Sequence, residues 1–291
     1  MIRYDIVKDW KFGELQHGYG ERELILYALA AGLGTDPVDP RALRFVQERG
    51  LLALPTFATL VGAPGAWWRD PRTGADGLRL VHGEQHLQVF RPLPTQGPLL
   101  ARNRVHSITD KGVGRGAIGV VLRDIFDPAD GTIVARSTNV SFLRGDGGFS
   151  ESDGRSDPPP QPLPAVPERA PDCTVAVPTQ PESALLYRLT GDMNPIHSDP
   201  QVARAAGFPR PILHGLCTYA MACHAVLKQL LDYDPVRLTG LAMRFTAPVL
   251  PGDTLNFELW RESASRWRLR GRVVERNLTV IDNGIVELTE A

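Results

Sequence analysis

Four residues in two short segments have the types and spacing needed for proton transfer. Asp192, Asn194 and His197 place a carboxylate, a carboxamide and an imidazole within six residues, and Gly215 follows in the motif Pro211-Ile212-Leu213-His214-Gly215. An imidazole and a carboxylate can move protons near neutral pH. A glycine N–H can stabilise a developing oxyanion because no side chain hinders its approach. The two segments therefore predict proton transfer beside an oxyanion.

Pro195 is expected to set the geometry of this group. A proline disfavours helical backbone at the residue before it. The helix predicted around Tyr187 should therefore not continue, and the chain should turn at Asn194. Asp192 and His197 can then face one another.

Each of these positions also has a purely structural interpretation. The pattern Gly-Asp-x-Asn-Pro is good turn sequence by itself, so Asp192 and Asn194 could serve only the turn. His197 could be a capping or core histidine. For His214 a structural role is favoured, and the functional backbone group is then supplied by Gly215.

Length and composition describe a globular protein. The chain has 291 residues, 43% of them hydrophobic, and a net charge of -1. That is enough for one large domain or two of ordinary size. The charge balance does not point to nucleic acid or an anionic membrane as the main partner.

Cysteine usage and the chain ends predict a cytosolic protein. The three cysteines form no CxxC pair, which favours a reducing compartment. The N-terminus lacks the apolar core of a signal peptide, and no apolar run reaches the roughly 18 residues that span a bilayer. The final residues are not a peroxisomal address of the Ser-Lys-Leu type.

A proline-rich segment divides the chain. Residues 157–181 contain nine prolines, beginning with Pro158-Pro159-Pro160. Such a run disfavours helix and central strand, so it predicts a linker laid across a surface. The expected domains are an N-terminal repeat, 1–156, and a C-terminal repeat, 182–291.

The two halves are similar to each other, which indicates an ancient duplication. Three pairs of segments match in order: 27–32 with 187–192, 55–57 with 211–213, and 89–94 with 245–251. The N-terminal copy has Gly32 where Asp192 would fall and Pro37 where His197 would fall. One active site per chain is therefore expected.

Each half is predicted to be one long apolar helix followed by several strands. In the C-terminal half, residues 213–231 are apolar on most faces, which predicts a buried helix. Short, partly alternating segments at 241–245, 254–261, 266–275 and 279–288 follow, separated by turn residues, and predict antiparallel strands. A helix wrapped by a curved antiparallel sheet, occurring twice, is an α+β arrangement.

The motifs together resemble a known family. Residues 187–197 are similar to the signature of the 2-enoyl-CoA hydratase 2 family, the MaoC-like hydratases, and the likeness runs along essentially the whole chain. It is strongest to the hydratase portion of peroxisomal multifunctional enzyme type 2. Further matches in the same order are His82-Gly83-Glu84-Gln85, Asp110-Lys111-Gly112, Leu54-Pro55-Thr56-Phe57 and Pro211-Ile212-Leu213-His214-Gly215-Leu216-Cys217-Thr218. The resemblance implies a double hot-dog fold whose N-terminal repeat has lost its catalytic residues.

The implied reaction is reversible addition of water to a trans-2-enoyl-CoA, giving a (3R)-3-hydroxyacyl-CoA. The resemblance assigns proton transfer to Asp192 and His197, and Asn194 could fix the water between them. The N–H of Gly215, at the start of a buried helix, would stabilise the thioester oxyanion. Coenzyme A is then part of the substrate, with no separate cofactor or metal, and a homodimer is expected.

The resemblance also implies a substrate site built from both halves. Its residues are His82, Gly83 and Lys111 from the N-terminal repeat, and Met193, Pro195, Ile196 and Phe245 from the C-terminal repeat. Lys111 suits a coenzyme A phosphate, although it could equally be a solvated turn lysine. Gly62-Ala63-Pro64-Gly65 suggests a loosened N-terminal helix that would widen the acyl tunnel.

Two other motifs do not carry chemistry. Gly114-Arg115-Gly116-Ala117-Ile118-Gly119 spells the dinucleotide-binding pattern but precedes an apparent strand rather than a helix. His82-Gly83-Glu84-Gln85-His86 lacks the spacing of a zinc helix. The alternative functions are a dehydratase for another acyl thioester (bound to acyl carrier protein, branched, dicarboxylic or with a steroid side chain), or a non-catalytic acyl-CoA-binding protein.

Overall fold

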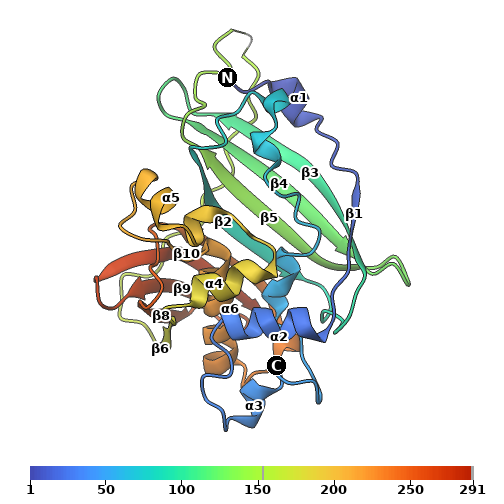
Figure 1. Ribbon diagram of the computed structural model, residues 1–291, viewed down its shortest axis with the longest axis vertical. Helices are drawn as coiled ribbons and strands as arrows, with labels where there is room; N and C mark the ends of the chain where they lie inside the picture. The colour runs from blue at the N-terminus through green and yellow to red at the C-terminus, as the bar shows by residue number, and fades with distance from the viewer. Residues whose placement is uncertain (153, 290–291) are drawn as a thin grey trace.

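A single antiparallel sheet of ten strands organises the computed structural model, which describes residues 1–152 and 154–289. The strands lie in the order β1-β3-β4-β5-β2-β7-β10-β9-β8-β6, so each half of the chain supplies five neighbouring strands (Figure 1). Their bounds are β1 Glu14–His17, β2 Leu80–Val89, β3 Leu99–Asp110, β4 Ala117–Phe126, β5 Ile133–Leu143, β6 Cys173–Pro178, β7 Leu238–Phe245, β8 Thr254–Arg261, β9 Arg266–Val273 and β10 Leu278–Leu288.

The two halves meet where β2 pairs with β7. His86 lies opposite Ala242 in this pairing, and the two residues are 156 positions apart. Val89 and Phe245, matched from the sequence alone, are separated by the same interval. The strand order on either side of this pair is also mirrored. The internal repeat is therefore expressed as an approximate twofold axis through the centre of the sheet.

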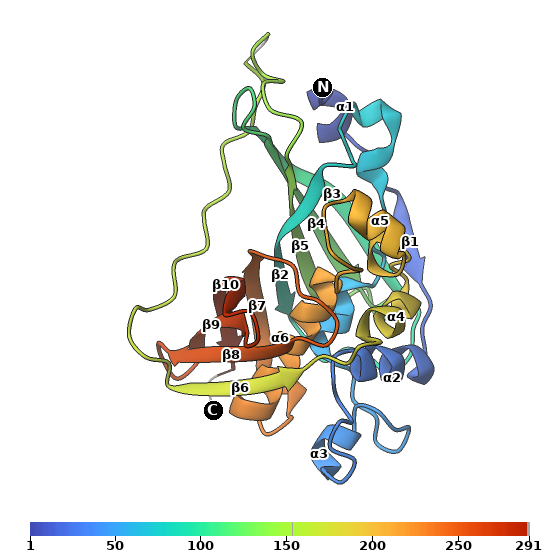
Figure 2. The same ribbon diagram turned by 60° about the vertical axis from the view of Figure 1, so that its left-hand side comes forward.

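The helices cover one side of the sheet, and the proline-rich segment passes on the other (Figure 2). The α-helices are α1 Tyr4–Lys8, α2 Glu21–Ala30, α3 Pro40–Leu43, α4 Ser183–Tyr187, α5 Pro200–Ala205 and α6 Gly215–Leu230. Short 3-10 helices are η1 Pro55–Thr59, η2 Trp67–Arg69, η3 Pro71–Thr73, η4 Arg188–Thr190, η5 Pro195–His197 and η6 Pro235–Arg237.

The long helix expected in the C-terminal half is confirmed as α6. Residues 217–227 of this helix are all buried, because they are apolar on nearly every face and the sheet curves around them. Val226 and Leu227 are fully buried. Burying side chains of this size stabilises the fold by about 1.5–3 kcal/mol each.

The long helix expected in the N-terminal half is absent from the described residues, and that prediction was wrong. The five-residue η1 stands in its place. Gly62 follows with φ +58°, and a Cβ there would lie only 2.2 Å from the Cβ of Ala101 on β3. The backbone after η1 thus runs directly against the sheet, which leaves no room for further helical turns.

The predicted linker also differs from the structure. Residues 173–178 form β6, which pairs with β8 at the edge of the sheet. Val175 and Val177 point inward and are buried between exposed neighbours. An edge position tolerates Pro178, whose nitrogen has no hydrogen to donate to a ladder. The high proline content led to the prediction of a linker here, and the short alternating strand was not predicted.

The matched tyrosines of the two repeats touch at the centre of the molecule. Tyr27 of α2 and Tyr187 of α4 are fully buried, with ring centroids 5.9 Å apart. The helices α2 and α4 lie side by side (Figure 1). This contact places the segment after α4, which carries Asp192 and His197, close to the inner face of the sheet.

Candidate active site

The turn expected at Pro195 is present and is held by its own side chains. Asn194 has extended backbone (φ -57°, ψ 121°), and its Oδ1 accepts the N–H of Ile196 at 3.3 Å. Asp192 Oδ1 accepts the N–H of Asn194 at 3.1 Å. The short helix η5 begins at Pro195 and brings His197 back toward Asp192. Asn194 therefore caps η5 through its side-chain oxygen.

His197 is fixed in the tautomer that a general base needs. Its ring is buried, and Nδ1 donates to the carbonyl oxygen of Ile212 at 2.8 Å. The proton on Nδ1 leaves a lone pair on Nε2. Burial lowers the pKa of His197, which keeps the ring neutral at neutral pH.

His214, for which the sequence favoured a structural role, lies in the same group. Its ring stacks on His197, with centroids 3.7 Å apart and planes 25° apart. Nε2 donates to the carbonyl oxygen of Asp192 at 3.1 Å, so His214 holds the Asp192 backbone in place. Burial and the neighbouring His197 lower the pKa of His214. Nδ1 is buried with no partner among the described residues.

One oxygen of Asp192 and one nitrogen of each histidine lie within 4.8 Å of one another. Asp192 is exposed, whereas His197 and His214 are buried. A metal could in principle use such a set, since Zn–N bonds are about 2.0–2.1 Å. However, the two stacked rings lie in nearly parallel planes, 25° apart, so their in-plane lone pairs are poorly placed to converge on one ion. The arrangement is better suited to holding a water between the carboxylate and His197.

Gly215 begins α6 directly beside this group. The first N–H groups of a helix have no partner within it, and they carry the positive end of the helix dipole. The first backbone hydrogen bonds of α6 run from the N–H groups of Cys217 and Thr218 to the carbonyl of His214, both at 3.1 Å. A Cβ on Gly215 would lie 3.6 Å from the Phe245 ring and would fill the space beside the N–H.

The N-terminal repeat contributes His82 from the start of β2. Its ring meets Phe245 edge to face, with centroids 5.0 Å apart. Nε2 lies 2.8 Å from the Asn139 amide and 3.1 Å from the carbonyl oxygen of Glu84. Burial lowers the pKa of His82 to about 4, so the ring is neutral. A bulge at Gly83 turns the strand here, and a Cβ there would lie 3.2 Å from the Val140 carbonyl.

The remaining predicted substrate residues lie further out. Met193 and Pro195 are exposed on the turn, and Ile196 is half-buried. Lys111 is exposed after β3, and its ammonium lies 5.0 Å from the centre of the Phe142 ring.

Some residues of the site had no local signal in the sequence. Asn139 reaches His82 from β5, and the register between β2 and β5 sets that contact. The Tyr187 ring packs on the His214 ring, with centroids 4.8 Å apart. The sequence showed Tyr187 as part of the signature but did not show this contact. The pairing of His214 with His197 depends on how α6 docks, which spacing alone does not give.

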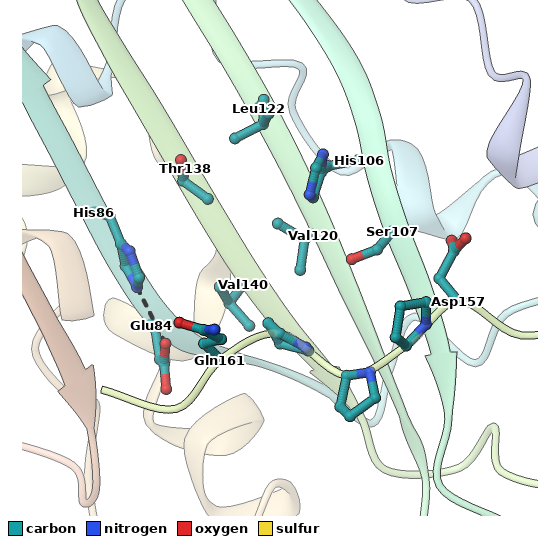
Figure 3. A pocket seen from close by; sticks show the side chains of 13 residues that line it. Glu84, His86, His106, Ser107, Val120, Leu122, Thr138, Val140, Asp157 and Gln161 are labelled. Carbon is teal, nitrogen blue, oxygen red and sulfur yellow. Dashed lines mark hydrogen bonds and ion pairs between the residues drawn. The ribbon is translucent and has the colours of Figure 1, made fainter. Parts of the chain in front are cut away.

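A groove of about 570 Å³ lies on the opposite face of the sheet (Figure 3). Glu84, His86, Thr138 and Val140 line it, and these alternate along β2 and β5 with the inward-facing Gln85 and Asn139. Its Glu84–His86 pair, 3.1 Å apart, is separate from the group around Asp192. The segment 82–86, which lacks the spacing of a zinc helix, is thus part of strand β2.

Comparisons with known proteins identify the family of the chain. Residues 163–284 match the family described as MaoC like domain, and residues 17–145 match the MFE-2 hydratase 2 N-terminal domain. Peroxisomal enoyl-CoA hydratase 2 of Arabidopsis thaliana is 38% identical over 95% of this chain and 93% of its own. A MaoC-like dehydratase from Phytophthora capsici is 28% identical, with a TM-score of 0.85 over 100% of both chains.

The fold expectation is also confirmed. A Mycobacterium tuberculosis protein described as having a double hot-dog fold superposes with a TM-score of 0.56 over 96% of each chain. At 17% identity this likeness concerns the fold alone. It agrees with the ten-stranded sheet and its approximate twofold axis.

Proposed function

The chain belongs to the MaoC-like hydratase 2 family, and from that premise we propose that it is an (R)-specific 2-enoyl-CoA hydratase. Family membership supports the coarser activity, hydration or dehydration of an acyl thioester by a hydro-lyase. The observation that carries the proposal is the cluster of Asp192, His197 and His214 within 4.8 Å, where His214 is followed directly by Gly215, which begins α6 beside Phe245. The (R) stereochemistry rests on the resemblance to hydratase 2 enzymes.

The proposed mechanism adds one water across the C2–C3 double bond. A water held by Asp192 gives one proton to His197 Nε2 as its oxygen bonds to C3. The C2–C3 π electrons move toward the thioester, whose oxygen accepts the N–H of Gly215. A proton from the Asp192 and His197 pair then bonds to C2, so the product carries one H and one OH from water. The reaction moves no net electrons and calls for no redox cofactor.

Supporting residues hold these groups still. The Ile212 carbonyl fixes the His197 tautomer, and His214 holds the Asp192 backbone. A preorganised backbone donor of this kind is worth a factor of about 10²–10³ in rate. General acid–base groups contribute about 10²–10⁴. Together they account for much of the catalysis that the site would have to provide.

The substrate and assembly are part of the same proposal. The partner is an acyl-CoA thioester, and the active protein is a homodimer. None of the helices within residues 1–152 and 154–289 combines the length and hydrophobicity needed to cross a bilayer.

The test is direct. Purified protein is mixed with crotonyl-CoA or a long-chain trans-2-enoyl-CoA, loss of the enoyl absorbance is followed, and the product is analysed on a chiral column. We expect the (3R) alcohol from wild type and almost none from Asp192→Asn. An (S) product would reject the stereochemical assignment. Tight acyl-CoA binding without turnover of either substrate would favour the non-catalytic alternative.

A dehydratase for another acyl thioester is the second candidate, because the same groups run the reverse reaction. The presence and close approach of Asp192 and His197 argue for catalysis in either direction. Measuring kcat/KM in both directions, with coenzyme A and acyl-carrier-protein thioesters, shows which substrate is turned over efficiently and so separates the two.

A further inference from the structure

An arginine without a carboxylate partner is buried in the N-terminal repeat. Arg123, on β4, is 6% exposed. Its Nη1 donates to the carbonyl oxygen of Val61 at 2.9 Å, and its Nη2 donates to Ser137 Oγ at 3.4 Å. Its Nε is buried and has no partner in the described part of the chain. Burying an unpaired charge is costly, so such a group calls for an explanation.

The C-terminal repeat shows how this chain otherwise treats a buried arginine. Arg268, on β9, is 3% exposed and lies 3.3 Å from the Glu262 carboxylate. Its Nε also donates to the Gly284 carbonyl at 2.9 Å. No ion pair to a described carboxylate involves Arg123. Burial, and after it the charge of Arg123, lowers the pKa of His17, as expected of an uncompensated cation.

Arg123 lies on the same inner face of the sheet as the proposed active site. Ser137 Oγ, which it contacts, also accepts from Gln85 Nε2 at 2.9 Å. Ser137 and Asn139 are two residues apart on β5, about 7 Å along a strand, and their side chains share a face. Asn139 in turn contacts His82. A line of polar groups therefore leads from His82, beside Phe245, to the guanidinium.

The missing N-terminal helix explains why this face can be polar. In the C-terminal repeat, α6 packs apolar side chains against the corresponding face. In the N-terminal repeat the short η1, the chain after it and α1 lie against the sheet, and Val61, just after η1, offers a backbone carbonyl. Two of the five N–H donors of Arg123 are used, which leaves donors for a ligand.

We propose that Arg123 binds an anionic group at the far end of the acyl chain, so the preferred substrates are 2-enoyl thioesters that carry a terminal carboxylate. This inference rests on the proposed hydratase function and specifies its substrate class. The acyl chain lies along the inner face past Asn139, with its thioester at Gly215 and its carboxylate at the guanidinium. A guanidinium–carboxylate pair in a buried site is strong and geometrically selective.

A bound water offers a different account of the same atoms. Asn103 lies opposite Arg123 in the sheet, and its Oδ1 is also buried without a partner among the described residues. A water between Asn103 Oδ1 and Arg123 Nε would satisfy both without any substrate group. That account predicts no preference for a charged acyl chain, so the two can be separated.

The experiment compares matched substrates that differ only at the far end. Trans-2-hexenoyl, octenoyl and decenoyl thioesters of coenzyme A are made with either a methyl or a carboxylate terminus, and kcat/KM is measured for wild type, Arg123→Lys and Arg123→Met. For at least one length we expect wild type to favour the carboxylate by about ten- to hundredfold, the usual value of a charge-assisted hydrogen bond. Arg123→Met should bring this ratio near one, and Arg123→Lys should keep part of it.

The matched control is Arg104→Met. Arg104 is an exposed arginine on the neighbouring strand β3, paired with Asp124 at 2.7 Å, and its loss should leave the ratio unchanged. Binding of the saturated suberyl and octanoyl thioesters is measured by calorimetry, which needs no turnover. The inference is overturned if wild type shows no preference at any length in binding or rate. It is also overturned if Arg123→Met lowers both substrate types equally together with Tm. Absent turnover with a retained binding preference would reject the hydratase proposal instead.

Discussion

The two repeats share a sheet but differ in what they place against it. Under α6 the inner face of the C-terminal repeat is apolar and fully buried, with Leu241, Met243, Leu269 and Val286. The same face of the N-terminal repeat carries a group of polar residues among its buried apolar ones: Gln85, Ser137, Asn139, Ser141 and Arg123 lie beside Leu87, Ala135 and Ile125. One repeat packs a helix and the other leaves polar groups facing the interior. The sheet itself therefore does not decide the function of a repeat.

The catalytic groups differ in the same way. At the matched interval of 156 positions, Ala58 and Thr59 of the N-terminal repeat stand where His214 and Gly215 stand in the C-terminal repeat. Thr59 also ends the five-residue η1, whereas Gly215 begins a 16-residue helix. The N-terminal repeat thus lacks the backbone donor, the stacked histidine and the helix dipole together. Together with Gly32 and Pro37 in place of the catalytic pair, these differences leave no matching site in the N-terminal repeat.

The largest expected effect comes from removing the proton-transfer pair and trying to rebuild it in the other repeat. Asp192→Asn should lower kcat/KM for crotonyl-CoA by about a thousandfold, within the range for a general acid–base group. Adding Gly32→Asp and Pro37→His should not restore activity, because Ala58 and Thr59 cannot supply the other half of the site. Steady-state kinetics and chiral product analysis measure both.

The control for charge removal is Asp39→Asn. It makes the same aspartate-to-asparagine change at the N-cap of α3 in the N-terminal repeat. It should leave kcat/KM within about twofold of wild type, since surface changes away from a site have small effects. Recovery of more than about a tenth of wild-type activity in the rebuilt variant would contradict the view that the N-terminal repeat lost its whole site.

The next effect compares Gly215, which begins α6, with Thr59 at the matched position of the N-terminal repeat. Gly215→Ala should lower kcat by about a hundredfold, because the added methyl occupies the space beside the N–H that the thioester oxygen needs. At 3.6 Å from Phe245 that methyl makes an ordinary contact, so Tm should change little. Thr59→Ala at the matched position should leave kcat unchanged. Equal effects at both positions would show that Gly215 acts through folding.

The features of the molecule differ in how far apart in the sequence the residues that determine them lie. The turn at Asn194, the helix α6 and the strand β8 follow from prolines, an apolar run and alternation within short windows, and the sequence predicted them. The family resemblance then gave the double hot-dog fold. The assignment of Asp192 and His197 was also local, since a single proline-fixed turn brings them together.

The features that the sequence analysis did not predict depend on contacts between residues far apart in the chain. The strand β6 is stable only because β8, about 80 residues later, pairs with it. The absent N-terminal helix depends on Gly62 meeting Ala101 across the sheet. The stacking of His214 on His197, the contact from Asn139 and the isolation of Arg123 likewise need the final register. Within one segment, only the Gly62-Ala63-Pro64-Gly65 pattern pointed to any of these features, by suggesting that the N-terminal helix is loosened.

The third effect is a pH dependence that belongs to the C-terminal repeat. Burial lowers the pKa of His197 below the ordinary histidine value of about 6.5, so the neutral base persists to lower pH. Below the lowered pKa one proton disables the base, and kcat/KM should fall by about tenfold per pH unit. An acid limb centred above the ordinary value would contradict the neutral, buried assignment.

The same burial has a consequence for stability. The unfolded chain binds protons at His197 and His214 with ordinary pKa values, whereas the folded chain resists them. The free energy of unfolding should therefore be highest above the ordinary histidine pKa and should decrease as pH falls toward the lowered values. Thermal melts across this interval measure it. A His197→Gln variant should lose part of the slope.

The smallest effect asks whether the N-terminal repeat contacts the coenzyme A end of the substrate. The Lys111 ammonium is exposed and lies over the Phe142 ring, an arrangement worth about 0.5–1 kcal/mol. Lys111→Met should change KM for crotonyl-CoA by less than about twofold, with Lys11→Met, at another exposed lysine, as control. A rise of about tenfold that weakens in high salt would reveal a phosphate contact. The N-terminal repeat would then bind both ends of the substrate, instead of the acyl end alone.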